Sequence, residues 1–374
     1  MGRTRKPVSR ISRPRILHAP TNVAGIAGLL ARAQRDLGHD ATSVEYFPRS
    51  FQFGVDSTLG LQAGDGRFKK ATRMGLFALG AFTRYDVFHL YFGNTLLPSP
   101  YPDLRLLRAL GKRIVFHFCG CELRRREPNL TEYSLSACTD CVWHRCMQLK
   151  HPDLSSADVL IVSTPDLLEF APGAHLLPGP VDLDRWTPRV SGRVPGSRSE
   201  PVRIVHAPTN REVKGTKYLL AAVERLKRAG YAVELDLLEG LPHEQVQVLS
   251  ERADIAVDQL MIGSYGTFAI EMMARGLPVV CRIREDLRQF YPPDLPVITA
   301  EPGSIYEVLE SLITRPDTWA DLGRRGIQYV QREHEMHRVA ARALALYNVG
   351  LSIASAPAPG DPSYIPEASD IRAV

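Results

Sequence analysis

The chain has 374 residues, of which 44% are hydrophobic and 23% are charged, and its formal net charge is +5. At about 150 residues per domain this length predicts two domains, and the composition is that of a globular protein. A wholly disordered chain, a collagen and a small disulfide-stapled scaffold are thereby excluded.

The positive charge is concentrated at the start of the chain. Residues 1–15 contain six Lys and Arg and no acid, so the rest of the chain is close to neutral. A nucleic-acid-binding protein would carry a basic stripe within the fold, so we expect no nucleic-acid partner. No apolar stretch is long enough to cross a bilayer, and no apolar run follows the basic start. We therefore expect a cytoplasmic protein in which residues 1–14 form a flexible basic arm.

An internal repeat organises the chain. RILHAPTN (15–22) recurs almost unchanged as RIVHAPTN (203–210). Each copy begins with a short apolar strand, turns at Pro-Thr-Asn, and leads into a helical pattern and a second apolar run. This strand–turn–helix–strand order predicts a βαβ unit with parallel strands. Two copies about 190 residues apart indicate two similar α/β domains rather than a solenoid, whose repeats are shorter. The expected helices are 25–38 and 216–230, each followed by a strand, at 41–47 and 232–238.

Further strands and helices follow the same rhythm. The domains are predicted as an N-terminal domain (15–182), a linker (183–201), a C-terminal domain (202–330), a C-terminal helix (331–350) and a disordered tail (351–374). The remaining strands are expected at 85–92, 112–118, 158–164, 175–181, 254–260, 277–283 and 295–300, with helices at 102–111 and 266–276.

The most informative segment is ADIAVDQLMIGSYGTFAIEMMARGLPVV (253–280). Its turn opens a helix, and the free amides and positive end of a helix can hold a phosphate. Glu271, inside that helix, could accept hydrogen bonds from vicinal sugar hydroxyls. The alternative is an ordinary helix start with a surface Glu. The turn residues that would contact the donor are Ser264, Tyr265, Gly266 and Thr267.

This segment resembles the donor-site signature of glycosyltransferase family 4, A-D-x4-P-S-x2-E-G-F-G-x4-E-A-M-A-x-G-x-P-V-V. It aligns without a gap through Ala253-Asp254, Tyr265-Gly266, Glu271 and 273–280. One departure concerns the contacts to the donor sugar. Gly263 stands where the family has its first acid, and Asp258 could substitute for that acid only if the loop folds differently.

The resemblance implies a GT-B fold, in which two Rossmann-like doubly wound domains face each other across a cleft. It also implies a retaining glycosyltransferase that moves a sugar from a nucleotide-sugar donor to a glycan, lipid-linked or other hydroxyl acceptor, in polysaccharide or glycoconjugate synthesis. In this family Glu271 would orient the donor ribose, and catalysis would need no metal. The alternatives are a non-catalytic nucleotide-sugar-binding protein and a sugar-nucleotide epimerase of the same fold.

The second repeat continues as HAPTNREVKGTKYLL (206–220). A Lys-Gly pair opening a helix after a strand suits a diphosphate, because a point charge joins the helix dipole. The segment is similar to the family's G-R-x4-K-G motif, whose basic residues neutralise the leaving nucleoside diphosphate. Lys214 and Gly215 match it, and Arg211 lies two residues late. The alternative is a solvated helix start. Thr209 and Asn210 complete the expected donor contacts.

Two features of the first half resemble family positions near the acceptor and the sugar. His117 ends an expected strand, where relatives place a His close to the reacting centre; the alternative is a hydrogen-bonded structural His. The loop at 18–28 resembles the family's acceptor loop, with Gly25 allowing close approach, although Asn22 could simply cap the following helix.

Five of the six cysteines lie within 119–146, which we treat as an insertion. Their C-x-C and C-x2-C spacings suit a structural zinc, with a disulfide or redox pair and plain thiols as alternatives. Four of these five would be ligands: Cys119, Cys121, Cys138, Cys141 and Cys146.

Residues 67–84 place four basic side chains before ten apolar residues. Basic residues near anionic lipid contribute about 1 kcal/mol each. Family members that glycosylate lipid-linked acceptors often dock on the membrane through such a helix. This segment therefore predicts peripheral contact with an anionic membrane, or alternatively a core helix with a solvated start.

Overall fold

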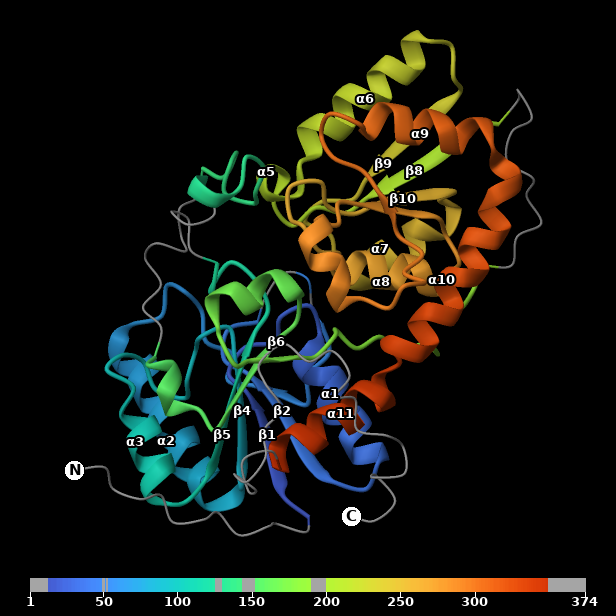
Figure 1. Ribbon diagram of the computed structural model, residues 1–374. Helices are drawn as coiled ribbons and strands as arrows, with labels where there is room; N and C mark the ends of the chain where they lie inside the picture. Colours follow the sequence, from blue (N-terminus) through green and yellow to red (C-terminus); the bar gives the residue numbers. More distant parts are fainter. Residues whose placement is uncertain are drawn as a thin grey trace.

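The computed structural model describes residues 13–48, 51, 53–124, 130–142, 152–189 and 200–348. These residues form two α/β domains, each built on one parallel sheet (Figure 1). The basic arm and the tail predicted at 351–374 lie outside the described residues.

The first sheet has seven strands in the order β3-β2-β1-β4-β5-β6-β7, all parallel. Neighbouring residues along its strands alternate between its two faces, as the two-residue period of a strand requires. Leu17 packs with helices α2 and α3, whereas Ile16 packs with α1 and α11. Its elements are β1 (Arg15–Ala19), α1 (Ile26–Asp36), β2 (Asp40–Glu45), β3 (Ser57–Thr58), α2 (Arg67–Arg84), β4 (Val87–Tyr91), α3 (Pro102–Ala109), β5 (Arg113–Phe118), η2 (Leu154–Ser156), β6 (Val159–Val162), η3 (Pro165–Phe170) and β7 (His175–Leu176).

The second sheet has five parallel strands in the order β12-β11-β10-β8-β9. Helices α6 and α9 cover one face, and α8 and α10 cover the other. Its elements are β8 (Val202–His206), α5 (Arg211–Lys214), α6 (Thr216–Arg228), β9 (Val233–Leu237), α7 (His243–Leu249), η4 (Ser250–Arg252), β10 (Ile255–Val257), α8 (Thr267–Ala274), β11 (Val279–Cys281), η5 (Glu285–Phe290), β12 (Ile298–Thr299), α9 (Ile305–Thr314), η6 (Pro316–Thr318) and α10 (Trp319–Glu333).

The chain returns to the first domain at its C-terminal end (Figure 1). Helix α11 (Met336–Asn348) packs on α1 and completes the first domain's core. A short parallel bridge between Val181 and Glu335 marks the crossing, where the Val181 amide donates to the carbonyl of His334. The C-terminal helix predicted at 331–350 therefore consists of the end of α10 and the whole of α11.

The predicted helices at 25–38, 102–111, 216–230 and 266–276 correspond to α1, α3, α6 and α8. The strands expected at 175–181 and 295–300 are shorter than predicted, because each segment contains proline, which cannot donate to a sheet ladder. Within the described part of the chain, no helix combines the length and apolarity needed to cross a bilayer.

Candidate functional site

The loops at the carboxyl ends of β8 and β10 carry most of the predicted donor contacts, which is where open α/β sheets bind ligands. After β8 the chain turns at Asn210, whose side chain accepts a hydrogen bond from the Val213 amide at 2.8 Å. Gly215 has φ +77°, and a Cβ there would lie 3.1 Å from Leu260 and Met261. Gly215 therefore lets α6 start directly against the loop that follows β10.

Lys214 and the start of α8 lie close together, as predicted, and the carboxylate of Asp258 connects them. Lys214 Nζ lies 2.8 Å from Asp258 Oδ1 and 2.6 Å from Gln259 Oε1. Asp258 Oδ2 accepts a hydrogen bond of 2.6 Å from the Gly266 amide. Asp258 therefore reaches the helix start, although it precedes Gly266 by eight residues. From the sequence, Asp258 is a candidate only for replacing the acid that Gly263 lacks.

The turn before α8 differs from prediction in two side chains. Tyr265 points into the core of the second domain, where its hydroxyl lies 3.0 Å from Tyr329 OH and 3.0 Å from His334 Nε2. Ser264 is fully buried. The Tyr265 ring is buried because an aromatic ring beside an apolar core is more stable there than in water. Contact of the donor with the backbone of Ser264 and Tyr265 stays a prediction. Gly266 and Thr267 remain at the partly exposed helix start.

Glu271 faces a residue that sequence reasoning missed. Its Oε1 lies 2.6 Å from His243 Nε2, and its side chain is nearly buried. The His243 ring packs against Phe53, with ring centroids 4.6 Å apart, and its amide donates to the Phe51 carbonyl at 3.0 Å. The first domain thus helps to hold His243 beside Glu271. No local motif marks His243, because only the fold brings the start of α7 to α8.

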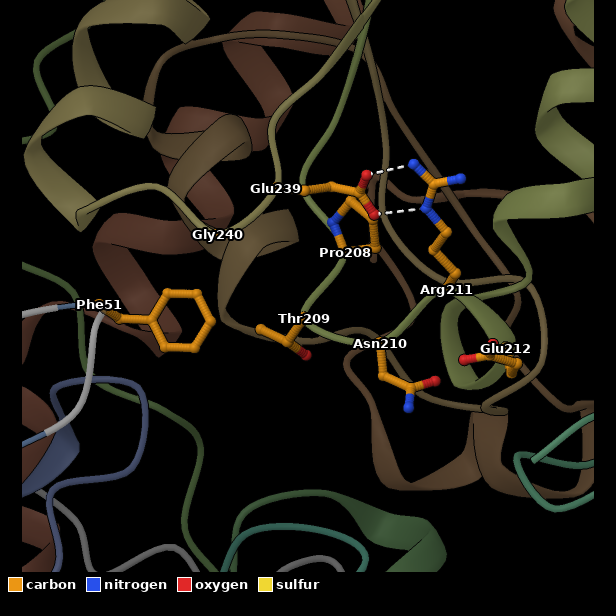
Figure 2. A pocket seen from close by; sticks show the side chains of 8 residues that line it. All are labelled: Phe51, Pro208, Thr209, Asn210, Arg211, Glu212, Glu239 and Gly240. Atoms are coloured by element: carbon orange, nitrogen blue, oxygen red, sulfur yellow. Dashed lines mark hydrogen bonds and ion pairs between the residues drawn. The ribbon is translucent and has the colours of Figure 1, made fainter. Parts of the chain in front are cut away.

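A pocket of about 320 Å³ opens beside these residues (Figure 2). Figure 2 shows the ring of Phe51 on one side and Thr209 and Asn210 on the other. Arg211 makes a bidentate pair with Glu239, which lowers the pKa of Glu239 and raises that of Arg211. Arg211 is therefore at the pocket, as expected, but its charge is already paired. The lining residues are Phe51, Pro208, Thr209, Asn210, Arg211, Glu212, Glu239 and Gly240.

His117 lies within the first sheet rather than at the cleft. Its Nδ1 is 3.1 Å from His89 Nε2, and its Nε2 is 2.9 Å from Ser163 Oγ. Burial lowers the pKa of His117 to about 3. Both ring nitrogens already have partners and the side chain is buried, which fits the alternative of a structural His, and a contact of His117 with the sugar stays a prediction.

The two residues expected in the acceptor loop pack against a neighbouring loop. Asn22 is buried, and its amide nitrogen lies 3.3 Å from the Gly54 carbonyl while its Oδ1 accepts from the Gly28 amide. Gly25 has φ +77°, and a Cβ there would lie 3.1 Å from the Phe53 ring. Asn22 thus positions the loop that carries Phe53 instead of facing the cleft.

The cysteine-containing insertion bridges the domains. Asp140 accepts hydrogen bonds from Lys217 at 2.9 Å and from the Tyr218 hydroxyl at 3.0 Å. Tyr133 OH lies 3.0 Å from Arg284, and Arg282 donates to the Leu135 carbonyl.

The zinc site in this insertion stays a prediction. Cys119, Cys121, Cys138 and Cys141 are described, whereas Cys146 lies outside the described residues. Among the residues that are described, no group of three or more His, Cys, Asp or Glu is arranged to hold a metal ion.

A buried acid follows β5 that sequence reasoning did not single out. Glu122 accepts a hydrogen bond from the Cys119 amide, and burial raises the pKa of Glu122 to about 7. Two residues on, Arg124 pairs with Asp166, with 2.6 Å between Nε and Oδ2. In the sequence, the only feature that marks these buried charges is the spacing of Glu122 and Arg124 shortly after β5.

Comparison with known proteins supports the arrangement of the two domains. Sucrose-phosphate synthase from Thermosynechococcus elongatus has a TM-score of 0.59 at 16% identity, covering 90% of this chain and 98% of that one. HepE from Anabaena, in complex with UDP and glucose, has a TM-score of 0.58 at 11% identity, covering 89% and 99%. The catalytic domain of starch synthase IV from Arabidopsis thaliana, bound to ADP and acarbose, has a TM-score of 0.62 at 12% identity, covering 90% and 99%.

At these identities the structures establish the fold. No curated protein matches the sequence. A family model described as glycosyl transferase-like matches residues 221–345, which include α8 and Glu271. The chain therefore has the GT-B fold, and its residues 221–345 match the glycosyl transferase-like family model.

Proposed function

We propose that the protein is a retaining glycosyltransferase that uses a nucleotide-sugar donor. One observation carries this proposal: Lys214 Nζ and the Gly266 amide at the start of α8 converge on a single carboxylate. Two donors of this kind, a cation and a helix N-terminus, form a site suited to an anion. Glu271 lies in the same helix, one turn further on. A nucleoside diphosphate has both an anion and a vicinal diol for such a site.

The second domain would bind the nucleotide. In this proposal the pocket beside Thr209 and Asn210 takes the nucleoside, and Glu271 accepts hydrogen bonds from the ribose hydroxyls while His243 holds its carboxylate in place. Lys214 stabilises the charge that develops on the leaving diphosphate, helped by Arg211 when it leaves Glu239. Fixed positive groups of this kind can stabilise a leaving group without a metal ion, so we propose metal-independent transfer.

The first domain would receive the acceptor, and α2 suggests what kind. Phe68, Leu76 and Leu79 are 86%, 67% and 63% exposed, and helical spacing puts all three on one face. Lys69 and Arg73 lie in the same helix, between Phe68 and Leu76 in the sequence. An apolar stripe flanked by basic residues suits the interface of an anionic membrane. We propose that the acceptor is lipid-linked and that α2 brings the protein to the membrane surface.

A donor-hydrolysis and binding assay with UDP-, GDP- and ADP-sugars tests the proposal. Slow hydrolysis of one donor, lost in Lys214→Ala, supports it. Binding without turnover, in the presence of acceptor extracts, would instead favour a non-catalytic nucleotide-sugar-binding protein. Gly263, which replaces the usual acid, is the feature that favours this second candidate. A structural zinc in the cysteine-containing insertion is tested separately, by metal analysis of the reduced protein.

A further inference from the structure

We propose that Asp258 is an internal anion that occupies the diphosphate subsite in the donor-free protein and must leave Lys214 when the donor binds. The inference rests on the proposed function and adds a specificity-determining residue to it. It concerns the step at which a nucleoside diphosphate enters the site.

The position of the Asp258 carboxylate supports this role. One oxygen lies 2.8 Å from Lys214 Nζ, and the other accepts a 2.6 Å hydrogen bond from the Gly266 amide. A phosphate at the start of α8 would need these same two donors. The carboxylate thus makes the contacts of a bound anion while belonging to the chain itself.

Gly266 makes this close approach possible. A Cβ on Gly266 would lie 3.2 Å from Asp258 Oδ2 and 3.3 Å from Lys214 Nζ. A side chain at this position would crowd any anion between the lysine and the backbone. The absence of a side chain at Gly266 therefore leaves room for the Asp258 carboxylate beside Lys214.

Electrostatics makes Asp258 and a diphosphate mutually exclusive. The Asp258 side chain is 1% exposed and that of Lys214 is 14% exposed, so solvent screens the pair weakly. A diphosphate placed against Lys214 would lie beside the carboxylate, and like charges a few ångströms apart repel strongly in such a site. Gln259 Oε1 also holds Lys214, at 2.6 Å, but is neutral and can stay. Only Asp258 has to move.

The exchange gives the site selectivity among anions. Inorganic phosphate or pyrophosphate has only its own negative charge with which to displace Asp258. A nucleotide gains further contacts at Glu271 and in the pocket beside Thr209, and these contacts help to drive the displacement. Arg211 does not provide the same barrier, because its pair with Glu239 is exposed and such pairs contribute little.

The test compares pyrophosphate binding to the full chain and to Asp258→Asn by calorimetry. The amide oxygen can still accept from Gly266, but the negative charge is gone. We expect Asp258→Asn to bind pyrophosphate at least about tenfold more tightly, which corresponds to about 1.4 kcal/mol. Glu234→Gln is the matched control, because it removes one carboxylate from a surface pair with Arg203 and changes the net charge equally. Equal or weaker pyrophosphate binding by Asp258→Asn, or an equal gain in Glu234→Gln, would overturn the proposal.

A second measurement needs no variant. Glycine-selective ¹⁵N labelling follows the Gly266 amide of the wild-type chain during titration with UDP, GDP and ADP. We expect its resonance to move when a nucleotide saturates the site, because its acceptor changes from carboxylate to phosphate. An unmoved resonance with a bound nucleotide contradicts the exchange. If no nucleotide binds, the proposed function fails, and the pyrophosphate comparison still decides the role of Asp258.

Discussion

Arg284 packs its aliphatic stem directly against Gly263, so that a Cβ added to Gly263 would overlap with Arg284 Cβ, Cγ and Cδ. The Arg284 guanidinium donates a hydrogen bond to Glu169 and lies over the Tyr133 ring, and both of these residues belong to the first domain. The donor-site signature has an acid at this position, and this chain has Gly263. The space of that acidic side chain is therefore not empty here. Its position is filled by an arginine that ties the two domains together.

Restoring the acid should consequently destabilise the protein. We expect Gly263→Glu to lower the free energy of unfolding by about 1–3 kcal/mol, the usual cost of overpacking a buried site. Thermal and urea unfolding of the full chain measure this change. The double variant Gly263→Glu with Arg284→Ala should recover part of the loss, since it removes the overlapping stem. A single variant as stable as the wild type would contradict the packing argument.

His243 should affect nucleotide binding through Glu271. Replacing His243 by Ala leaves the Glu271 carboxylate without its partner at 2.6 Å and frees it to turn away from the ribose. We expect about a tenfold weaker nucleotide affinity, or 1.4 kcal/mol, with a smaller change in kcat than in KM. His337→Ala, at a partly exposed His far along the chain, is the control. Unchanged affinity in His243→Ala would exclude the positioning role.

Five buried histidines, three in the first domain and two in the second, should make stability depend on pH. Burial lowers the pKa of His18, His206 and His334 to about 4 and of His117 to about 3, and lowers that of His89 well below its ordinary value. The unfolded chain takes up protons near pH 6.5 while the folded chain does not, so stability is complete above this pH and falls as pH drops toward 4.

Urea unfolding at several pH values between 7 and 4 measures this fall. His89→Gln should reduce the dependence, because it removes one of the five groups. His337 has the opposite sign: Glu335 and Asp36 raise its pKa, and its contribution is lost as pH rises. A profile that stays flat from pH 7 to 4.5 would contradict the prediction.

The exposed face of α2 should bind anionic vesicles. We expect wild-type protein to sediment with phosphatidylglycerol vesicles and not with phosphatidylcholine vesicles, since both apolar contact and charge are needed. Leu76→Gln with Leu79→Gln should reduce this binding without changing stability, because both side chains are exposed. Val248→Gln, which removes an exposed apolar side chain from the second domain, is the control. Equal binding by all three proteins would show that α2 is not the contact.

The sequence by itself determined the architecture and the segments that form the proposed donor site. The repeat at 15–22 and 203–210 marks two βαβ units, because strand and helix periodicity is local. The 253–280 segment likewise resembles the signature of a glycosyltransferase family, because its residues match at fixed spacing, and it lies within the residues that the glycosyl transferase-like model matches. Glu271 comes from this segment, and Lys214 and Arg211 come from 206–220. In the structure Lys214 reaches Asp258 after β10, Arg211 lines the pocket, and Glu271 in α8 contacts His243.

Only the tertiary structure decided which partner each of these side chains meets. Lys214 is paired with Asp258, Arg211 with Glu239 and Glu271 with His243, and these partners lie after β10, after β9 and at the start of α7. His117 ends a strand as predicted, but its side chain is buried among other polar side chains instead of facing the cleft. The physical reason is that periodicity depends on neighbours in the chain, whereas a hydrogen-bond partner depends on which loops packing brings to the same edge of a sheet.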